Sequence, residues 1–200
     1  MTAIPLGVID TGSANLASVV AAFRRLGHAP TLVRDAAAAR SANRLVLPGV
    51  GAFGAVMATL RTLGVADVLA ERFDAGRPLL AICLGFQVLS GASAESPGVA
   101  GLGILGGVAR RFPTGVRVPQ LGWNDVTPTQ SDGLVRPGFA FFANSYYLEA
   151  TDPSWTVSYA THGVRFVAAA ERGSQLACQF HPELSGRWGA DVLERWWARC

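Results

Sequence analysis

Two side chains far apart in the sequence, a cysteine and a histidine, have local settings that suit covalent catalysis. Cys83 ends the apolar run Leu79-Leu80-Ala81-Ile82 and precedes Leu84-Gly85-Phe86-Gln87, a pattern typical of a strand, a sharp turn and a helix. A cysteine at such a turn lies over the free N–H groups of the next helix, which favour a thiolate and can bind a developing oxyanion. The segment therefore predicts a nucleophile.

The histidine lies near the other end of the chain, in His181-Pro182-Glu183. Proline biases the residue before it toward extended geometry, and residues i and i+2 of an extended segment share one face. Glu183 could therefore orient His181, which makes a Cys-His-Glu triad the prediction. The two other histidines, His28 and His162, each adjoin a glycine at an expected turn, which favours surface positions for both.

Two further features have competing interpretations. Cys83 alone could be a small core residue, because buried free cysteine is common, and packing is the better interpretation for Cys178 on its apolar strand face. The loop Pro48-Gly49-Val50-Gly51 can bring its backbone close to a ligand and turn a peptide N–H toward it. An ordinary strand-to-helix turn is the alternative, and it would be favoured if the cysteine were absent.

The composition narrows the possible functions. The chain has 200 residues, half of them hydrophobic, which fits a single domain over residues 1–200. All 17 basic residues are arginine, so a lysine Schiff base and a Walker-type phosphate loop are excluded. Three scattered cysteines favour free thiols, and a net charge of +3 gives no nucleic-acid footprint. We expect a cytoplasmic protein with no membrane span, metal or cofactor.

The elements that must position these side chains follow from hydrophobic periodicity. The first part alternates strands and helices, and the region after residue 100 is rich in glycine, proline and short β-type runs. This pattern predicts an α/β fold: a single three-layer domain with a mostly parallel central sheet, helices on both faces and added antiparallel strands. Expected strands cover residues 6–10, 31–34, 44–47, 79–82, 116–118, 139–142, 155–160, 164–169 and 175–180. Helices are expected after residue 16, over 55–75 with a break near Gly64, and around 192–197.

Taken together, the motifs resemble the class I, triad-type glutamine amidotransferases, and within them the glutaminase subunits of imidazole glycerol phosphate synthase. The cysteine and His-Pro-Glu motifs are typical of the class, and three longer motifs single out the subfamily. These are residues 47–54 (Leu-Pro-Gly-Val-Gly-Ala-Phe-Gly), Gly122-Trp123-Asn124 and Ser145-Tyr146-Tyr147.

The resemblance implies a glutaminase mechanism. Cys83 would attack the side-chain amide of glutamine, His181 would carry the proton to ammonia, and Glu183 would hold the imidazole. The oxyanion would be stabilised by the N–H of Leu84 and by a reoriented amide in the Gly49-Val50-Gly51 loop. A glutamyl thioester would form and then be hydrolysed.

The resemblance also implies residues that bind the substrate. Gln87 and Glu95 would hold the α-amino end of glutamine, and Ser145 with Tyr146 its carboxylate. For Glu95 the alternative is a solvated loop acid, because exposed carboxylates are common.

A partner is implied as well, because the ammonia must be passed on without escaping. In the family it goes to a (β/α)₈ cyclase subunit, which makes imidazole glycerol phosphate in histidine biosynthesis, and the isolated glutaminase is nearly silent. Asn15, Trp123, Asn124 and Leu184 match the family's interface. The alternative for Trp123 is a core residue at a strand edge.

Three of the departures from the family pattern bear on the partner. Gln120 and Asn144 each stand where the family usually has a histidine, and Leu184 stands where a lysine follows His-Pro-Glu. The resemblance places all three on the partner face. A paralogous glutaminase that feeds another synthase, such as one for surface-sugar amidination, therefore remains an alternative. A glutaminase-like regulatory module without turnover is another, although Cys83 and His181 argue against it.

Overall fold

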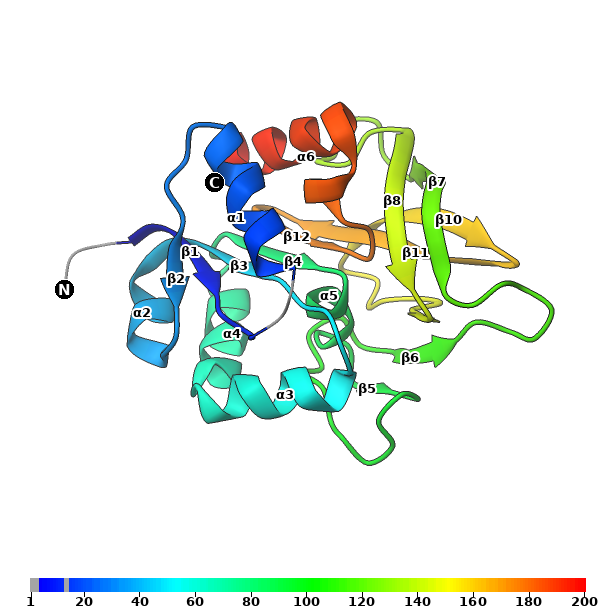
Figure 1. Ribbon diagram of the computed structural model, residues 1–200, viewed down its shortest axis with the longest axis horizontal. Helices are drawn as coiled ribbons and strands as arrows, with labels where there is room; N and C mark the ends of the chain where they lie inside the picture. The colour runs from blue at the N-terminus through cyan, green and yellow to red at the C-terminus, as the bar shows by residue number, and fades with distance from the viewer. Residues whose placement is uncertain (1–3, 13–14) are drawn as a thin grey trace.

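A computed structural model describes residues 4–12 and 15–200 (Figure 1). Strands and helices alternate in the first part, as the periodicity predicts. In chain order they are β1 (Ile4–Ile9), α1 (Leu16–Arg25), β2 (Thr31–Val33), α2 (Ala36–Ser41), β3 (Ala42–Leu47), α3 (Phe53–Thr62), α4 (Val65–Asp74) and β4 (Leu79–Ile82). The break between α3 and α4 falls at Gly64, whose φ of 64° favours glycine.

The second part adds mostly antiparallel strands. It comprises α5 (Leu84–Gln87), β5 (Ala92–Ser93), β6 (Val108–Arg111), β7 (Gln120–Pro128), β8 (Gly138–Asn144), β9 (Tyr146–Tyr147), β10 (Thr156–His162), β11 (Val164–Arg172), β12 (Gln175–Cys178), the 3₁₀ turn η1 (Pro182–Leu184) and α6 (Gly186–Arg199). Nine strands form one mixed sheet in the order β2-β1-β3-β4-β12-β11-β10-β7-β8. Strand β12 joins its two halves, because it is parallel to β4 and antiparallel to β11.

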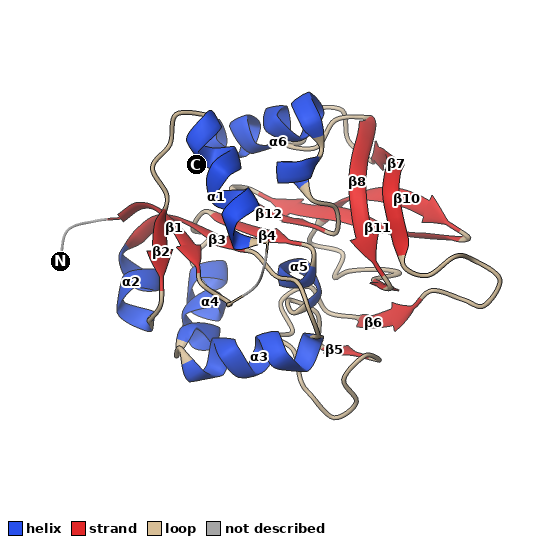
Figure 2. Ribbon diagram, viewed as in Figure 1, coloured by secondary structure: helices blue, strands red, loops and turns tan. Residues whose placement is uncertain are grey.

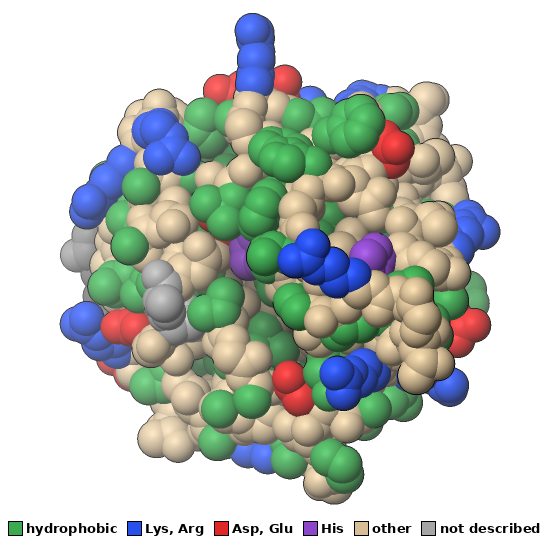
Figure 3. Space-filling model, turned by 45° about the vertical axis from the view of Figure 1, so that its right-hand side comes forward, with side chains coloured by type: hydrophobic (Ala, Val, Ile, Leu, Met, Phe, Trp, Pro, Cys, Tyr) green, Lys and Arg blue, Asp and Glu red, His purple; other side chains and the backbone are tan. Residues whose placement is uncertain are grey.

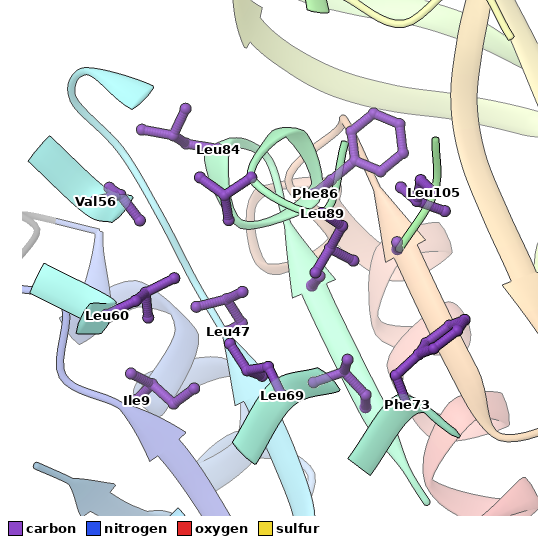
Figure 4. Packing of buried hydrophobic residues seen from close by; sticks show 14 of the residues in the cluster. Ile9, Leu47, Val56, Leu60, Leu69, Phe73, Leu84, Phe86, Leu89 and Leu105 are labelled. Atoms are coloured by element: carbon purple, nitrogen blue, oxygen red, sulfur yellow. The ribbon is translucent and has the colours of Figure 1, made fainter. Parts of the chain in front are cut away.

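Helices cover both faces of the parallel half (Figure 2). Alternate residues of each strand enter opposite cores, as the two-residue period of a strand requires: Val8 packs with α1 and α6, whereas Ile9 packs with α3 and α4. Figure 4 shows the second of these cores, in which Ile9, Leu47 and Leu69 lie beside one another. In the described part of the chain no single helix is long and apolar enough to cross a membrane; only α3 and α4 together reach that length, and they are bent by 91°.

One predicted strand is wrong, and four observed strands were not predicted: β5, β6, β7 and β9. Residues 116–118 form a loop, and the strands lie on either side of it as β6 and β7. Pro113 and Pro119 flank the loop and lack the N–H that a ladder needs, while Gly115 has a φ of 95°. Val116 packs against the core instead of pairing.

Candidate active site

Cys83 occupies a strained turn between β4 and α5. Its φ of 54° is the only positive value of a non-glycine residue in the described part of the chain. The turn is held by two backbone hydrogen bonds, from Cys83 N to the Cys178 carbonyl (2.8 Å) and from Gln87 N to the Cys83 carbonyl (3.1 Å). It also requires glycine at position 85, where a Cβ would lie 2.1 Å from the Leu47 carbonyl oxygen. The strand-turn-helix prediction for this segment is confirmed.

The sheet topology brings the histidine to the same edge. Strands β4 and β12 are parallel neighbours, with Ile82 paired to Cys178, so the residues that follow them meet at their carboxyl ends. His181 is 3% exposed, and its ring lies close enough to Cys83 for the sulfur to raise the pKa of the imidazole. Its Nδ1 lies 2.7 Å from Glu183 Oε1. The structure thus brings the three predicted triad residues together.

The route by which Glu183 reaches the ring differs from the expectation. His181 is extended, with φ −101° and ψ 94°, as the following proline predicts. Glu183, however, belongs to the 3₁₀ turn η1 and not to an extended segment. The carboxylate therefore meets the imidazole because the chain folds back at Pro182. The predicted contact between Glu183 and His181 is present, but the two-residue period of an extended strand does not explain it.

The triad favours a charged imidazole. Burial disfavours the imidazolium, but hydrogen bonds to Cys83 and to Glu183 outweigh it and raise the pKa of His181 to about 10. His181 is therefore protonated near neutral pH, and Nδ1 donates its proton to Glu183 Oε1.

Asn15, just before α1, also contacts the triad. Its Nδ2 lies 2.5 Å from Glu183 Oε1 and 3.2 Å from His181 Nδ1. Because Nδ1 carries the proton shared with the carboxylate, only the contact to Glu183 is a hydrogen bond. The resemblance had assigned Asn15 to the partner interface; the structure lays its side chain against the catalytic carboxylate.

A cavity of about 140 Å³ adjoins Cys83 and is large enough for a small amino acid side chain. The four predicted glutamine-binding residues line it together with all the predicted oxyanion residues except Gly49: Val50, Gly51, Leu84, Gln87, Glu95, Ser145 and Tyr146. Glu95 is half-buried and its Oε2 accepts a 2.6 Å hydrogen bond from Phe53 N, at the start of α3. The alternative of a solvated loop acid is therefore wrong for Glu95.

The oxyanion donors are not both free. Leu84 N donates to the Gly49 carbonyl at 3.2 Å, so one predicted donor is occupied by the loop that was expected to assist it. Gly49 is tightly packed against the turn, since a Cβ there would lie 2.8 Å from Gly85 N. Rotation of the Gly49–Val50 peptide would release the Leu84 N–H and turn a second N–H toward the cavity.

The three residues that differ from the family pattern at the expected partner face lie in two different environments. Gln120 and Asn144 are only 5% and 4% exposed and pair directly across β7 and β8. Asn144 lines the Cys83 cavity. Their placement on the partner face is therefore wrong, because the inward side of these strands turns both side chains into the interior. Leu184, by contrast, is 42% exposed.

An exposed apolar surface lies beside the site. Trp123 is 57% exposed, so its alternative as a core residue is wrong, and its ring packs edge-on against Phe141. Asn124 is half-buried and its Nδ2 donates to the Thr161 carbonyl at 2.8 Å. Figure 3 shows hydrophobic side chains over this side of the molecule, with arginines scattered among them. We call the group of exposed apolar residues on β7, β8 and η1 the apolar surface: Leu121, Trp123, Phe139 and Leu184.

The remaining histidines lie outside the cavity. His28 stacks on Trp197 with ring centroids 3.6 Å apart, and His162 Nε2 lies 2.7 Å from the Arg117 carbonyl oxygen. Sequence reasoning gave no role to Gln179, which is fully buried with its Nε2 3.7 Å from Cys83 Sγ. The signal was present, because strand alternation places residues 179 and 181 on one face, opposite Cys178.

Comparison with known proteins agrees with this geometry. Residues 7–198 match the family model described as glutamine amidotransferase class-I. The chain is 41% identical to imidazole glycerol phosphate synthase subunit HisH of Methanothermobacter thermautotrophicus, covering 94% of this chain and 95% of that protein. It is 42% identical to the protein of the same name from Cutibacterium acnes, covering 96% of each. A crystal structure described as a glutamine amidotransferase superposes with a TM-score of 0.76 at 22% identity, covering 96% of both chains, which shows the fold.

Proposed function

The chain belongs to the class I glutamine amidotransferase family, and we propose that it is the glutaminase subunit of an imidazole glycerol phosphate synthase. It hydrolyses L-glutamine to glutamate and ammonia in histidine biosynthesis. The observation that carries the proposal is the position of His181 beside both Cys83 and Glu183, next to a cavity of about 140 Å³. One domain over residues 1–200, a cytoplasmic location and the absence of a cofactor stay predictions.

The proposed mechanism assigns a step to each triad residue. The Cys83 thiolate forms a bond to the side-chain carbonyl carbon of glutamine, and the His181 imidazolium gives its proton to the departing ammonia. A glutamyl thioester is left on Cys83. Water, deprotonated by His181, then breaks the thioester and releases glutamate. Glu183 keeps the imidazole oriented through both steps.

The oxyanion of each tetrahedral intermediate needs donors that the present conformation withholds. The occupied Leu84 N–H supports a resting state in which glutamine hydrolysis is slow. Freeing it, together with an amide of Val50 or Gly51, would complete the hole. Gln87 and Glu95 are proposed to bind the α-ammonium group of glutamine, and Ser145 with Tyr146 its carboxylate.

The partner in this proposal is a (β/α)₈ cyclase that receives the ammonia. The apolar surface is the proposed contact, with Trp123 as its anchor, because exposed aromatic side chains dominate many interfaces. Asn124 and Leu184 complete this contact, and Asn15 contacts the triad through Glu183. Leucine at position 184 replaces the charge of the family's lysine with an apolar contact, so association should depend weakly on salt.

Reconstitution with the cyclase encoded by the same organism tests the function. We expect glutamate release to rise by roughly 10²-fold or more when the cyclase and its nucleotide substrate are both present, as expected for completing an oxyanion hole. A chain that hydrolysed glutamine equally fast alone would contradict the resting state. Purification with a different synthase, and failure to support growth of a histidine auxotroph, would favour the paralogous glutaminase.

Truncating the anchor should weaken the complex. For Trp123→Ala we expect the Kd for the cyclase to rise about 30-fold, the usual cost of about 2 kcal/mol for losing a central aromatic residue. Titration calorimetry measures the change. Leu32→Ala is the matched control, since Leu32 is 37% exposed on β2, at the other edge of the sheet, and should leave the Kd unchanged. Equal effects of the two variants would exclude the apolar surface as the contact.

A further inference from the structure

A chain of buried amides connects the cavity to the nucleophile. Gln87 Nε2 donates to the Tyr146 carbonyl at 3.0 Å and to Gln179 Oε1 at 2.9 Å. Gln179 Nε2 then donates to Cys83 Sγ at 3.7 Å, a usual length for a hydrogen bond to sulfur. Gln87 is 4% exposed and Gln179 is completely buried, so water cannot replace these contacts.

The Tyr146 carbonyl fixes which group is the donor and which is the acceptor in each of these hydrogen bonds. A backbone carbonyl only accepts, so the amide group of Gln87 must present its nitrogen to Tyr146. That nitrogen also faces Gln179, which must therefore present its oxygen to Gln87. The only remaining polar end of Gln179 is its N–H donor, and it points at the sulfur of Cys83. Reversing either amide would place two oxygens or two N–H groups against each other.

We propose that Gln179 is a positioning residue that holds the sulfur of Cys83 and stabilises its thiolate form. A neutral donor in a buried site stabilises an anionic acceptor more than a neutral one. The bond opposes rotation of the sulfur away from the cavity, and it reaches the sulfur from the residue that directly follows β12.

The same chain orients Gln87 toward the substrate, and this part rests on the proposed function. Both N–H groups of Gln87 are used, so the oxygen is the free end that it offers to the cavity it lines. An oxygen suits the ammonium group of glutamine, because that group is a donor only. Binding of the ammonium group to Gln87 would polarise the hydrogen bonds from Gln87 to Gln179 and from Gln179 to Cys83, and so strengthen the donor at the sulfur.

Alkylation of Cys83 by iodoacetamide from pH 5 to 10, followed on the Cys83 peptide by mass spectrometry, tests the proposal. In Gln179→Met, which keeps the shape and removes the donor, we expect the rate at neutral pH to fall about tenfold and the midpoint of the profile to rise by about one pH unit. The plateau rate at high pH should be unchanged. Gln179→Glu, which retains an acceptor for Gln87, should shift the profile in the same direction.

Gln175→Met is the matched control. Gln175 is on β12, the strand that ends directly before Gln179, is 1% exposed and donates to the Phe73 carbonyl at 2.9 Å, away from the cavity. Its loss should leave the alkylation profile unchanged although it removes an equally buried amide. A wild-type profile in Gln179→Met, or an equal shift in Gln175→Met, overturns the proposal. If Gln179→Met does not fold, Gln179→Leu, which also removes the donor and adds no charge, decides by the same criterion. Failure of glutamate release in the wild-type complex would contradict the proposed function and leave this result unaffected.

Discussion

Replacing Cys83 with alanine should abolish glutamine-dependent turnover by the reconstituted synthase while ammonium-dependent turnover persists. The loss should be ~10⁴-fold or more, as for removal of a nucleophile from other triads. Neither remaining thiol can substitute: Cys178 is completely buried, and burial raises the pKa of its thiol well above the usual value. Complex formation should be retained, because Cys83 is 5% exposed and faces the cavity. Glutamate release and product formation from supplied ammonium are the two measurements.

Cys178→Ala is the control for this experiment. The substitution removes a thiol of the same size from the neighbouring strand β12. Because the Cys178 side chain belongs to the core, the variant should keep most of its glutamine turnover. A glutamine-mimicking electrophile should label Cys83 in the wild-type complex and in Cys178→Ala. Normal glutamine hydrolysis by Cys83→Ala would refute the nucleophile. Absence of an adduct in the wild type would instead favour the regulatory module.

The parallel half of the fold could be predicted because its signals are local. The strands before residue 83 are short apolar runs and the helices have apolar residues at helical spacing, so each element is determined by its own sequence. The candidate site could be predicted for the same reason, because Cys83 directly follows such an apolar run and Pro182 directly follows His181. The alternation of strands and helices also predicted parallel pairing, since parallel neighbours need crossover connections.

The later half depends on contacts that no local pattern contains. Strand β7 was not predicted because it includes Gly122, with a φ of 133°, and the polar pair Asn124-Asp125, and it is ordered by pairing with β8 along its length. Burial of Gln120 and Asn144 follows from the same register. The hydrogen bond from Leu84 N, at the start of α5, to the Gly49 carbonyl likewise joins two segments that are far apart in the sequence.

Glu183→Gln should lower glutamine turnover by about 10³-fold to 10⁴-fold, the range found when a triad carboxylate becomes an amide. The carboxylate is one of the groups that raise the pKa of His181 to about 10, so its loss lowers that pKa and the imidazolium disappears at lower pH. The upper pH limit of glutamine turnover should therefore move down. A pH–rate profile of the reconstituted variant measures both effects.

The free energy of unfolding should depend on pH, because the pKa of His181 differs between the folded and the unfolded chain. The pKa of His181 is about 10 in the folded chain against 6.5 for the free side chain, so protonated His181 stabilises the fold fully below pH 6.5. This contribution is lost as the pH rises through 10. Part of it depends on Glu183, so the difference in the free energy of unfolding between wild type and Glu183→Gln should narrow from pH 6.5 to 10. Urea unfolding at pH 6, 8 and 10 tests the trend, and a constant or widening difference would contradict it.

Glu183→Gln removes the charge of the carboxylate but keeps the shape of the side chain. Glu183 Oε1 accepts from both His181 and Asn15, whereas Oε2 is buried without a hydrogen-bond partner among the described residues. A glutamine must therefore turn its oxygen toward His181 and Asn15, since its N–H₂ group would face two donors there. Asn15→Ala removes one hydrogen bond and leaves the charge, so it should cost about tenfold in turnover without moving the upper pH limit. Retention of turnover within tenfold by Glu183→Gln would show that orientation of His181 does not need the carboxylate.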